Sequence, residues 1–378
     1  MPLFSKTKRR PIVLRVPSFT LSLKRVFEDK LRFVIPIVAL SITKIASALW
    51  IYSRFPHPLP HQGFASFGNV FDVFANWDTI FFMQNLTFKP YPPHMDGAYA
   101  FLPGYSLVIW AVYAVTRNMG VATALPALIF GIAWLPLFQA VAESYMSRNE
   151  ALGCTLMTAF FPYVFVFTTV AYSEPLFMFA CVASWYFYRR DKTLHAGFLA
   201  AVAAITRLYG IFLSVPMLLD LLIKRRWKRL PHILVPAAAL LGWFYFCYTK
   251  TGDWLASHTA GTFFGPPGQE WVLGKLIPFF SGSHKLFVQA EMMLIGIVGL
   301  LAFLCWNFDW RLSVYSIITF LGIVTLAGYL PSYPRFFSFI FPIWLNLKTR
   351  NRILVFLVCA LFFPHALWLW YQFHAGIP

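Results

Sequence analysis

The sequence predicts an all-α integral membrane protein, a polytopic bundle of about 10–12 transmembrane or partial helices. Of its 378 residues, 59% are hydrophobic and only 12% are charged, which is about half the charged fraction of an average soluble domain. The chain also contains 42 Phe, 17 Tyr and 14 Trp, more apolar surface than one soluble core could bury. Long stretches without a charge recur from end to end.

These stretches approach the roughly 20 apolar residues that a bilayer crossing needs. The first, Phe33–Tyr52, contains a single charge at Lys44, which would either reach the membrane surface or face an internal polar cavity. The others carry no Asp, Glu, Lys or Arg: Val121–Ala142, Ala151–Ala171, Pro175–Tyr188, Ile233–Thr249, Met292–Trp306, Leu312–Leu330 and Ile353–Tyr371.

The formal net charge of +17 does not indicate a nucleic-acid-binding protein, because the basic residues form short clusters between apolar segments. Such clusters mark the cytoplasmic side of membrane proteins. Residues 1–32 hold nine of the Lys and Arg residues. Their apolar positions recur at helical spacing, which favours a helix on an anionic membrane surface. We therefore separate a cytoplasmic N-terminal segment, 1–32, from a membrane domain, 33–378.

Two further clusters, 189–192 and 224–229, fix the topology of the middle of the chain. Both should be cytoplasmic, so the short segment between them must leave and return as a hairpin with Thr206–Gly210 at its outer tip. Alternation from these anchors predicts a first outer loop at 55–100 and a later one at 250–291. Phe101–Thr116 fits no full crossing and is interpreted as a re-entrant or partial helix.

Nearly all residues that could take part in catalysis or ligand binding fall in the predicted outer segments. They are Trp77 and Asp78 in the first loop, Tyr172 and Glu174 before the next helix, Arg207 at the hairpin tip, Asp253 and His258 in the later loop, and Arg335 near the end. A carboxylate at a membrane boundary can act as a general base on a hydroxyl group. Arginines there can hold a phosphate through paired hydrogen bonds. Together they indicate an enzyme that acts on a lipid phosphate.

Each of these residues also has a purely structural interpretation. Trp-Asp pairs are common in loops. Arg207 and Arg335 would equally serve as helix anchors at lipid headgroups. The Glu174-Pro175 pair is typical of the first turn of a helix, where the dipole favours a carboxylate.

Neither a metal nor an organic cofactor is expected. The five cysteines lie in apolar segments without CxxC spacing, which is typical of small core residues. His94 with Asp96, and Asp253 with His258, do not have a specific metal-ligand spacing. The sequence contains no glycine-rich phosphate-binding loop either.

Read in order, several short motifs resemble the GPI mannosyltransferase 2 (PIG-V-like) family of GT-C glycosyltransferases. The motifs are Asn76-Trp77-Asp78, Ala100–Gly104, Phe161-Pro162, Ala171–Phe177, Thr206–Gly210, Thr251–Trp254 before His258, and Arg335. They span roughly residues 35–345, and they are specific as an ordered set rather than singly.

The resemblance implies a GT-C-type membrane enzyme that transfers mannose, with inversion, from polyprenyl (dolichyl) phosphate mannose to a glycan or glycolipid acceptor. It places the catalytic base at Asp78. Arg207 and Arg335 are the candidates for holding the donor phosphate. Trp77, Tyr172, Glu174, Asp253 and His258 are the candidates for the sugar and acceptor site. The membrane would be the plasma membrane of a prokaryote or the endoplasmic reticulum of a eukaryote.

Two main alternatives stay open, besides a structural, non-catalytic membrane subunit, which would leave the outer carboxylates unexplained. One is a GT-C transferase that uses another lipid-linked sugar, because donor choice depends on pocket shape. The other is a lipid or sugar transporter, which would predict internal repeats and ionisable residues near the middle of the membrane. We find no repeat, and the ionisable residues gather toward one face.

Overall fold

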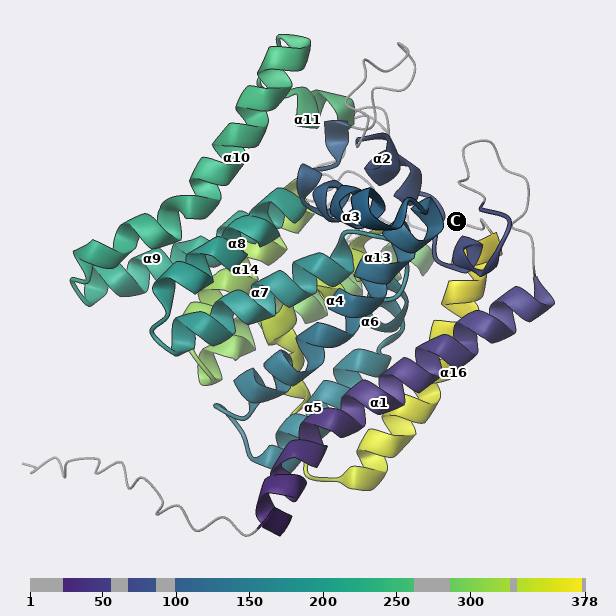
Figure 1. The fold of residues 1–378 in the computed structure, drawn as a ribbon. Helices are drawn as coiled ribbons and strands as arrows, with labels where there is room; N and C mark the ends of the chain where they lie inside the picture. Colours follow the sequence, from purple (N-terminus) through teal and green to yellow (C-terminus); the bar gives the residue numbers. More distant parts are fainter. Residues whose placement is uncertain (1–22, 56–66, 86–98, 262–285, 327–331, 376–378) are drawn as a thin grey trace, which may run out of the picture.

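The computed structural model describes residues 23–55, 67–85, 99–261, 286–326 and 332–375, and every regular element in these ranges is helical (Figure 1). The longer helices are α1 (Leu23–Arg54), α3 (Pro103–Thr116), α4 (Met119–Ala142), α5 (Arg148–Phe160), α7 (Glu174–Arg189), α8 (Thr193–Thr206), α9 (Ser214–Ile223), α10 (Leu230–Thr251), α13 (Leu286–Leu304), α14 (Trp310–Leu326) and α16 (Arg352–Ala375). The shorter ones include η1 (Val70–Val73), α2 (Thr79–Gln84), α6 (Pro162–Phe167), η3 (Leu208–Leu213), α11 (Ala256–Thr259) and α15 (Tyr333–Ser338).

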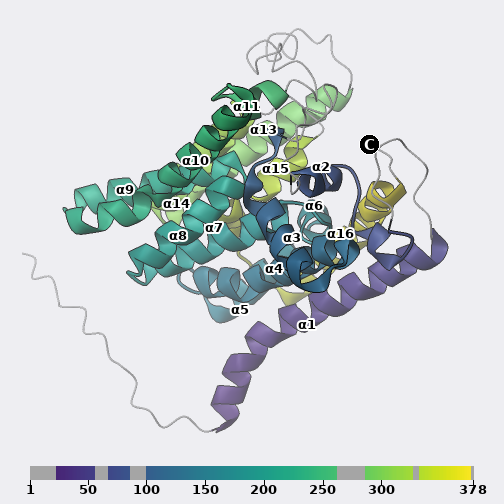
Figure 2. The same cartoon turned by 45° about the horizontal axis from the view of Figure 1, so that its top comes forward.

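Four of these helices, α1, α4, α10 and α16, are long and apolar enough to cross a bilayer, and five shorter apolar helices accompany them in the described ranges. The prediction of an all-α, polytopic membrane protein is therefore confirmed. In Figures 1 and 2, α1 and α16 lie toward one edge of the molecule and α9 lies at the other.

The predicted hairpin between the two basic clusters is present. Helix α8 runs from Thr193 to Thr206, and η3 and α9 bring the chain back to Ile223. Helix α10 then packs closely on α8. At their contact, a Cβ atom added at Gly197 would lie only 1.7 Å from the carbonyl oxygen of His232. Arg207 follows α8 directly and stands at the tip of the hairpin, as predicted.

Helix α3 is a partial helix, as expected for Phe101–Thr116. Its first turn contacts the end of α8, where a Cβ added at Gly104 would lie 2.4 Å from Thr206 Oγ1. It ends immediately before α4, whose Gly120 packs against Phe71 of η1. Both ends of α3 thus lie at the end of the bundle that carries η1 and the hairpin tip. Its exposed apolar side chains, among them Trp110, suit contact with lipid.

The uncharged stretch Ala151–Ala171 does not form one continuous helix, contrary to its interpretation as a single crossing. It divides into α5 and α6 at Phe161-Pro162. Proline lacks the backbone N–H that would continue the helix, and its ring clashes with the preceding turn. Helix α6 then ends at Thr168, inside the protein.

Helix α1 begins ten residues before the boundary that we placed between 32 and 33, and it continues without a break to Arg54. Residues 1–22, His94 and Asp96 lie outside the described residues, as do 56–66, 86–98 and 262–285 of the predicted outer loops.

Lys44 faces the protein interior, which decides between its two possible environments. Its ammonium group donates hydrogen bonds to the carbonyl and hydroxyl oxygens of Thr168, both at 2.8 Å, and lies 3.4 Å from the carbonyl oxygen of Gly131. Thr168 is the C-terminal cap of α6, and a cation is favoured at a helix C-terminus by the helix dipole. Lys44 therefore stabilises the internal end of a broken helix.

The same contact predicts a large effect of a single methyl group. A Cβ atom at Gly131 would lie 1.7 Å from the Thr168 carbonyl oxygen, so Gly131→Ala must push α4 and α6 apart. We expect a loss of at least about 3 kcal/mol in the free energy of unfolding, the upper end of overpacking effects. Thermal or denaturant unfolding in detergent measures it.

Gly242→Ala in α10 is the matched control, because a Cβ there meets nothing within 4 Å. That variant should be neutral or slightly stabilised, by up to about 1 kcal/mol, since alanine favours helix more than glycine. Equal stability of the two variants would contradict the close packing of α4 on α6.

The cysteines behave as small apolar residues. All five are free thiols, and Cys154, Cys181, Cys247 and Cys305 are buried, while Cys359 is partly buried. Within the described ranges, no three His, Cys, Asp or Glu side chains are grouped so as to hold a metal ion. The structure thus offers no metal centre there, and independence from metals and cofactors stays a prediction.

Candidate active site

Four charged side chains from distant parts of the chain meet at one end of the bundle. They are Asp78 before α2, Glu174 at the start of α7, Arg207 at the hairpin tip and Arg335 in α15. Two carboxylates and two guanidinium groups form a cluster with no net charge. We call it the Asp78 cluster.

Glu174 is the most deeply buried member, with a side chain only 1% exposed. Its Oε1 atom lies 2.6 Å from Arg207 Nη1 and 3.2 Å from Arg335 Nε. Pro175 occupies the first turn of α7, where its missing N–H leaves no hydrogen bond unmade. The helix-start interpretation of Glu174-Pro175 is therefore correct, and the same carboxylate also links the two arginines.

Asp78 is the more accessible carboxylate, with a side chain 24% exposed. It stands at the N-cap position of α2, yet its side chain makes no capping hydrogen bond. Arg335 Nη1 instead donates a hydrogen bond of 3.2 Å to Asp78 Oδ2. The carboxylate is thus held toward the cluster and is not used to terminate a helix.

Aromatic rings surround both guanidinium groups. Arg335 lies over the rings of Phe167, Tyr172 and Phe336, at 5.2, 5.3 and 4.8 Å from their centroids. Arg207 lies 4.7 Å from the centroid of Phe336. Such rings attract a cation through their negative faces. They also exclude water, which strengthens the electrostatic interactions of the cluster.

Burial raises the pKa of Asp78 above its ordinary value, although the positive charges of Arg335 and Arg207 act in the opposite direction. For Arg335, burial alone would lower the pKa, but the negative charges of Glu174 and Asp78 raise it above the usual range. The arginine is therefore a permanent cation, whereas the carboxyl of Asp78 takes up a proton more readily than an ordinary aspartate.

Backbone and side-chain hydrogen bonds fix the loop that carries Asp78. The Asp78 N–H donates to the Tyr172 hydroxyl at 3.1 Å, and Thr79 Oγ1 donates to the Ala171 carbonyl at 3.0 Å. On the other side, Asn76 Nδ2 donates to the carbonyls of Phe373 and His374 at the end of α16, both at 2.9 Å. The loop is clamped between the start of α7 and the last turn of α16.

Trp77 lies next to the catalytic candidate and is 37% exposed. Its backbone has a φ of 53°, in the left-handed region that bulky residues rarely adopt. Residues held in this conformation cost energy and occur preferentially at functional sites. A place for Trp77 beside a sugar stays a prediction.

Asp253 and His258 are not brought into contact with the Asp78 cluster. Asp253 accepts hydrogen bonds from the Leu255 N–H at 2.7 Å and from Thr259 Oγ1 at 2.8 Å, which is a local turn. His258 is exposed on α11. Helices α10 and α11 instead pack against Tyr99 and Leu102, just before α3. A role for the two residues toward the acceptor stays a prediction.

Sequence reasoning missed Phe167 and Phe336 as parts of the site. Phe336 directly follows Arg335 in α15, but this gave no usable signal, because adjacent residues of a helix do not face each other. Phe167 lies within an apolar run and has no distinguishing neighbour.

The crystal structures of ArnT from Cupriavidus metallidurans, bound to undecaprenyl phosphate and in the apo state, resemble 81% of this chain with a TM-score of 0.48 and 15% sequence identity. The match covers 59% of the first ArnT chain and 58% of the second, so this chain corresponds to less than two thirds of their length. We draw no conclusion about function from a likeness of this degree. No curated protein matches the chain.

Residues 99–248 match the family model described as dolichyl-phosphate-mannose-protein mannosyltransferase. This segment runs from just before α3 into α10 and includes Tyr172, Glu174 and Arg207, but neither Asp78 nor Arg335. It is less than half of the chain. The more specific resemblance to GPI mannosyltransferase 2 stays a prediction. The middle of the chain is thus similar to a family of mannosyltransferases, and it contains half of the Asp78 cluster.

Proposed function

We propose that the chain is a GT-C-type membrane glycosyltransferase that moves mannose from a polyprenyl (dolichyl) phosphate mannose to a glycan or glycolipid acceptor. The single observation that carries the proposal is the Asp78 cluster, in which a partly exposed carboxylate lies 3.2 Å from a buried, ring-enclosed arginine. The description of the family model over residues 99–248 supports both the sugar and the lipid phosphate.

In the proposed reaction, Asp78 accepts the proton of an acceptor hydroxyl as the oxygen attacks the anomeric carbon of the donor. The bond from that carbon to the phosphate oxygen breaks, and the polyprenyl phosphate leaves with the bonding electrons. A single displacement of this kind inverts the anomeric centre. The proton remains on Asp78 until solvent or the leaving phosphate takes it.

The leaving phosphate gains one negative charge in this step, and Arg207 and Arg335 would stabilise it. Each guanidinium group has five N–H donors. Nη1 of Arg207 contacts Ser173 and Glu174, and Nη1 and Nε of Arg335 contact Asp78 and Glu174, which leaves Nη2 of each residue for the phosphate. Preorganised donors in a water-poor site stabilise developing charge more than water does. Glu174 would hold the two arginines at the spacing that the phosphate requires.

Trp77 and Tyr172 flank Asp78 and are proposed to contact the transferred sugar. Glu174, Asp253 and His258 are the further candidates for the sugar and acceptor side. The Asp78 cluster lies at the end of α7 opposite to Arg189 and its basic neighbours. Because basic clusters mark the cytoplasm, we propose that transfer occurs at the outer or lumenal face and that the N-terminus is cytoplasmic.

The test is transfer of radiolabel from polyprenyl phosphate mannose in proteoliposomes, followed by identification of the labelled lipid or protein. Parallel reactions with polyprenyl phosphate glucose and galactose decide the donor. If label were transferred only from the glucose donor or only from the galactose donor, that sugar would replace mannose in the proposal. Movement of intact donor across the bilayer without transfer would instead show a transporter and contradict the proposal.

The pKa of Asp78 predicts the pH dependence of transfer. A base must be unprotonated to act, and burial raises the pKa of this carboxyl. The rate should therefore fall as the pH drops through a value above the usual aspartate pKa of about 4. Initial rates between pH 4 and 8 measure this acid limb. An acid limb at or below the ordinary aspartate value would contradict the assignment.

A further inference from the structure

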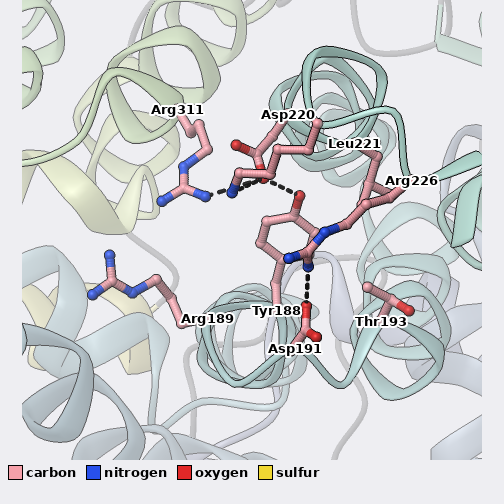
Figure 3. A pocket seen from close by; sticks show the side chains of 9 residues that line it. Tyr188, Arg189, Asp191, Thr193, Asp220, Leu221, Arg226 and Arg311 are labelled. Atoms are coloured by element: carbon pink, nitrogen blue, oxygen red, sulfur yellow. Dashed lines mark hydrogen bonds and ion pairs between the residues drawn. The ribbon is translucent and has the colours of Figure 1, made fainter. Parts of the chain in front are cut away.

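A second charged site lies at the opposite end of α7, about 22 Å from Glu174 at the 1.5 Å rise of a helical residue. The ends of α7 and α9 and the starts of α8 and α14 enclose a cavity of about 260 Å³. Figure 3 shows Arg189 and Arg311 on one side of this cavity, with Arg226 and Asp191 on another. We call it the basic cavity.

The inner wall of the basic cavity is a network of charges around the buried carboxylate of Asp220. Asp220 accepts hydrogen bonds from the Tyr188 hydroxyl at 2.7 Å and from Lys224 Nζ at 2.9 Å, and it lies 3.2 Å from Arg311 Nη1. Arg311 also binds both carboxylate oxygens of Asp309, at 2.8 and 2.6 Å. The side chains of this wall are thus held in place by one another.

The outer wall is cationic and accessible. The side chains of Lys224 and Arg226 are 46% and 45% exposed. Arg226 and Arg229 both pair with the single carboxylate of Asp191. Arg189 reaches Asp309, which Arg311 already neutralises.

The charges around the basic cavity do not cancel. Four cations line it, namely Arg189, Lys224, Arg226 and Arg311, against the two carboxylates of Asp191 and Asp220. Arg229 and Asp309, which pair with lining residues but do not line the cavity, add one charge of each sign. Two positive charges are left over. The site is therefore complementary to an anion that carries one or two negative charges.

A second cavity of about 510 Å³ adjoins the first, and both are lined by Asp220, Lys224 and Arg311. Its remaining wall contains Phe308, Asp309 and the indoles of Trp306 and Trp310. Trp306 is 59% exposed, and exposed tryptophans of membrane proteins gather at the headgroup level. A polar anion hole thus opens directly onto an aromatic surface.

We infer that the basic cavity binds the phosphorylated headgroup of an anionic membrane lipid, whose glycerol and chains leave past Trp306 and Trp310. Basic pockets between transmembrane helices on the cytoplasmic side recognise such headgroups. The phosphate would contact Lys224 and Arg226. A free phosphate ion shares this chemistry, but it has no apolar part that could contact the adjoining aromatic wall. We therefore propose the lipid as the ligand.

The test uses the full chain in detergent, with binding of phosphatidylglycerol measured by native mass spectrometry and by the shift in unfolding temperature. Phosphatidylcholine and inorganic phosphate serve as comparison probes. The variant Lys224→Gln/Arg226→Gln removes the exposed cations of the cavity. Arg225→Gln/Lys228→Gln is the matched control, since it removes the same charge from the same segment and neither residue lines the cavity.

We expect phosphatidylglycerol to bind and raise the unfolding temperature, and the cavity variant to weaken that binding at least about tenfold, with less than about twofold for the control. Equal weakening by both variants would mean diffuse attraction to a basic surface and would overturn the site. So would tight binding of phosphatidylcholine, or the absence of binding. Equal stabilisation by inorganic phosphate would overturn the lipid assignment. None of these results bears on mannosyl transfer at the Asp78 cluster.

Discussion

Replacing Asp78 with Asn should reduce the rate of sugar transfer by about 10²- to 10⁴-fold, the contribution typical of a positioned general base. The amide has the size of the carboxylate but cannot take up the acceptor proton. Binding of the donor should change little, because Arg207 and Arg335 remain. Initial rates with labelled donor, at several donor concentrations, separate the two effects.

Asp191→Asn is the matched control for this variant. Asp191 is an exposed aspartate at the other end of α7, and its left-handed backbone is one that asparagine tolerates well. That variant should keep wild-type transfer. If Asp78→Asn also kept it, Asp78 would not be the base, and the interpretation of the Trp-Asp pair as an ordinary loop pair would be sufficient.

Replacing Glu174 with Gln should lower the free energy of unfolding by about 3–5 kcal/mol, the usual cost of removing one partner from a buried ion pair. The carboxylate is 1% exposed and contacts both Arg207 and Arg335. Its loss leaves two cations with only Asp78 to compensate them. Denaturant unfolding in detergent gives the difference.

Glu143→Gln provides the comparison, because Glu143 pairs with Arg32 at 3.3 Å in a partly exposed position. That pair should contribute less than about 1 kcal/mol. Similar unfolding curves for the two variants would show that Glu174 does not hold the arginines together. If Glu174→Gln were as stable as the wild type but no longer transferred sugar, Glu174 would act in the reaction and not in stability.

The fold was largely predictable, because the information lies in local composition. Uncharged runs and basic clusters predicted α4, α10, α16 and the hairpin before Ile223. The break between α5 and α6 also has a local signal in the sequence, Pro162. One proline breaks a helix but hardly changes the average hydrophobicity of a long segment, on which the prediction of a crossing depends. Such breaks matter here, since the short helix that follows this one ends at Thr168, which Lys44 binds.

The candidate site was predictable only in part. Topology placed Asp78, Glu174, Arg207 and Arg335 on one side of the membrane, but it gave no distances. The pairing of Asp78 with Arg335 spans 257 positions of the chain, and no local pattern specifies such a contact. Asp253 satisfied the same topological argument and nevertheless folds into a local turn. Sharing a face of the membrane is thus necessary for a common site, but not sufficient.

The clamp on the Asp78 loop has a consequence for biosynthesis. Asn76 is bound by carbonyl groups of α16 that lie 297 and 298 positions later in the chain, and Trp370 Nε1 donates to the Val73 carbonyl at 3.0 Å. A growing polypeptide exposes the Asp78 loop long before these partners are synthesised. We therefore expect the loop to reach its final orientation only when α16 is inserted, and under the proposed function a chain that lacks α16 would not transfer sugar.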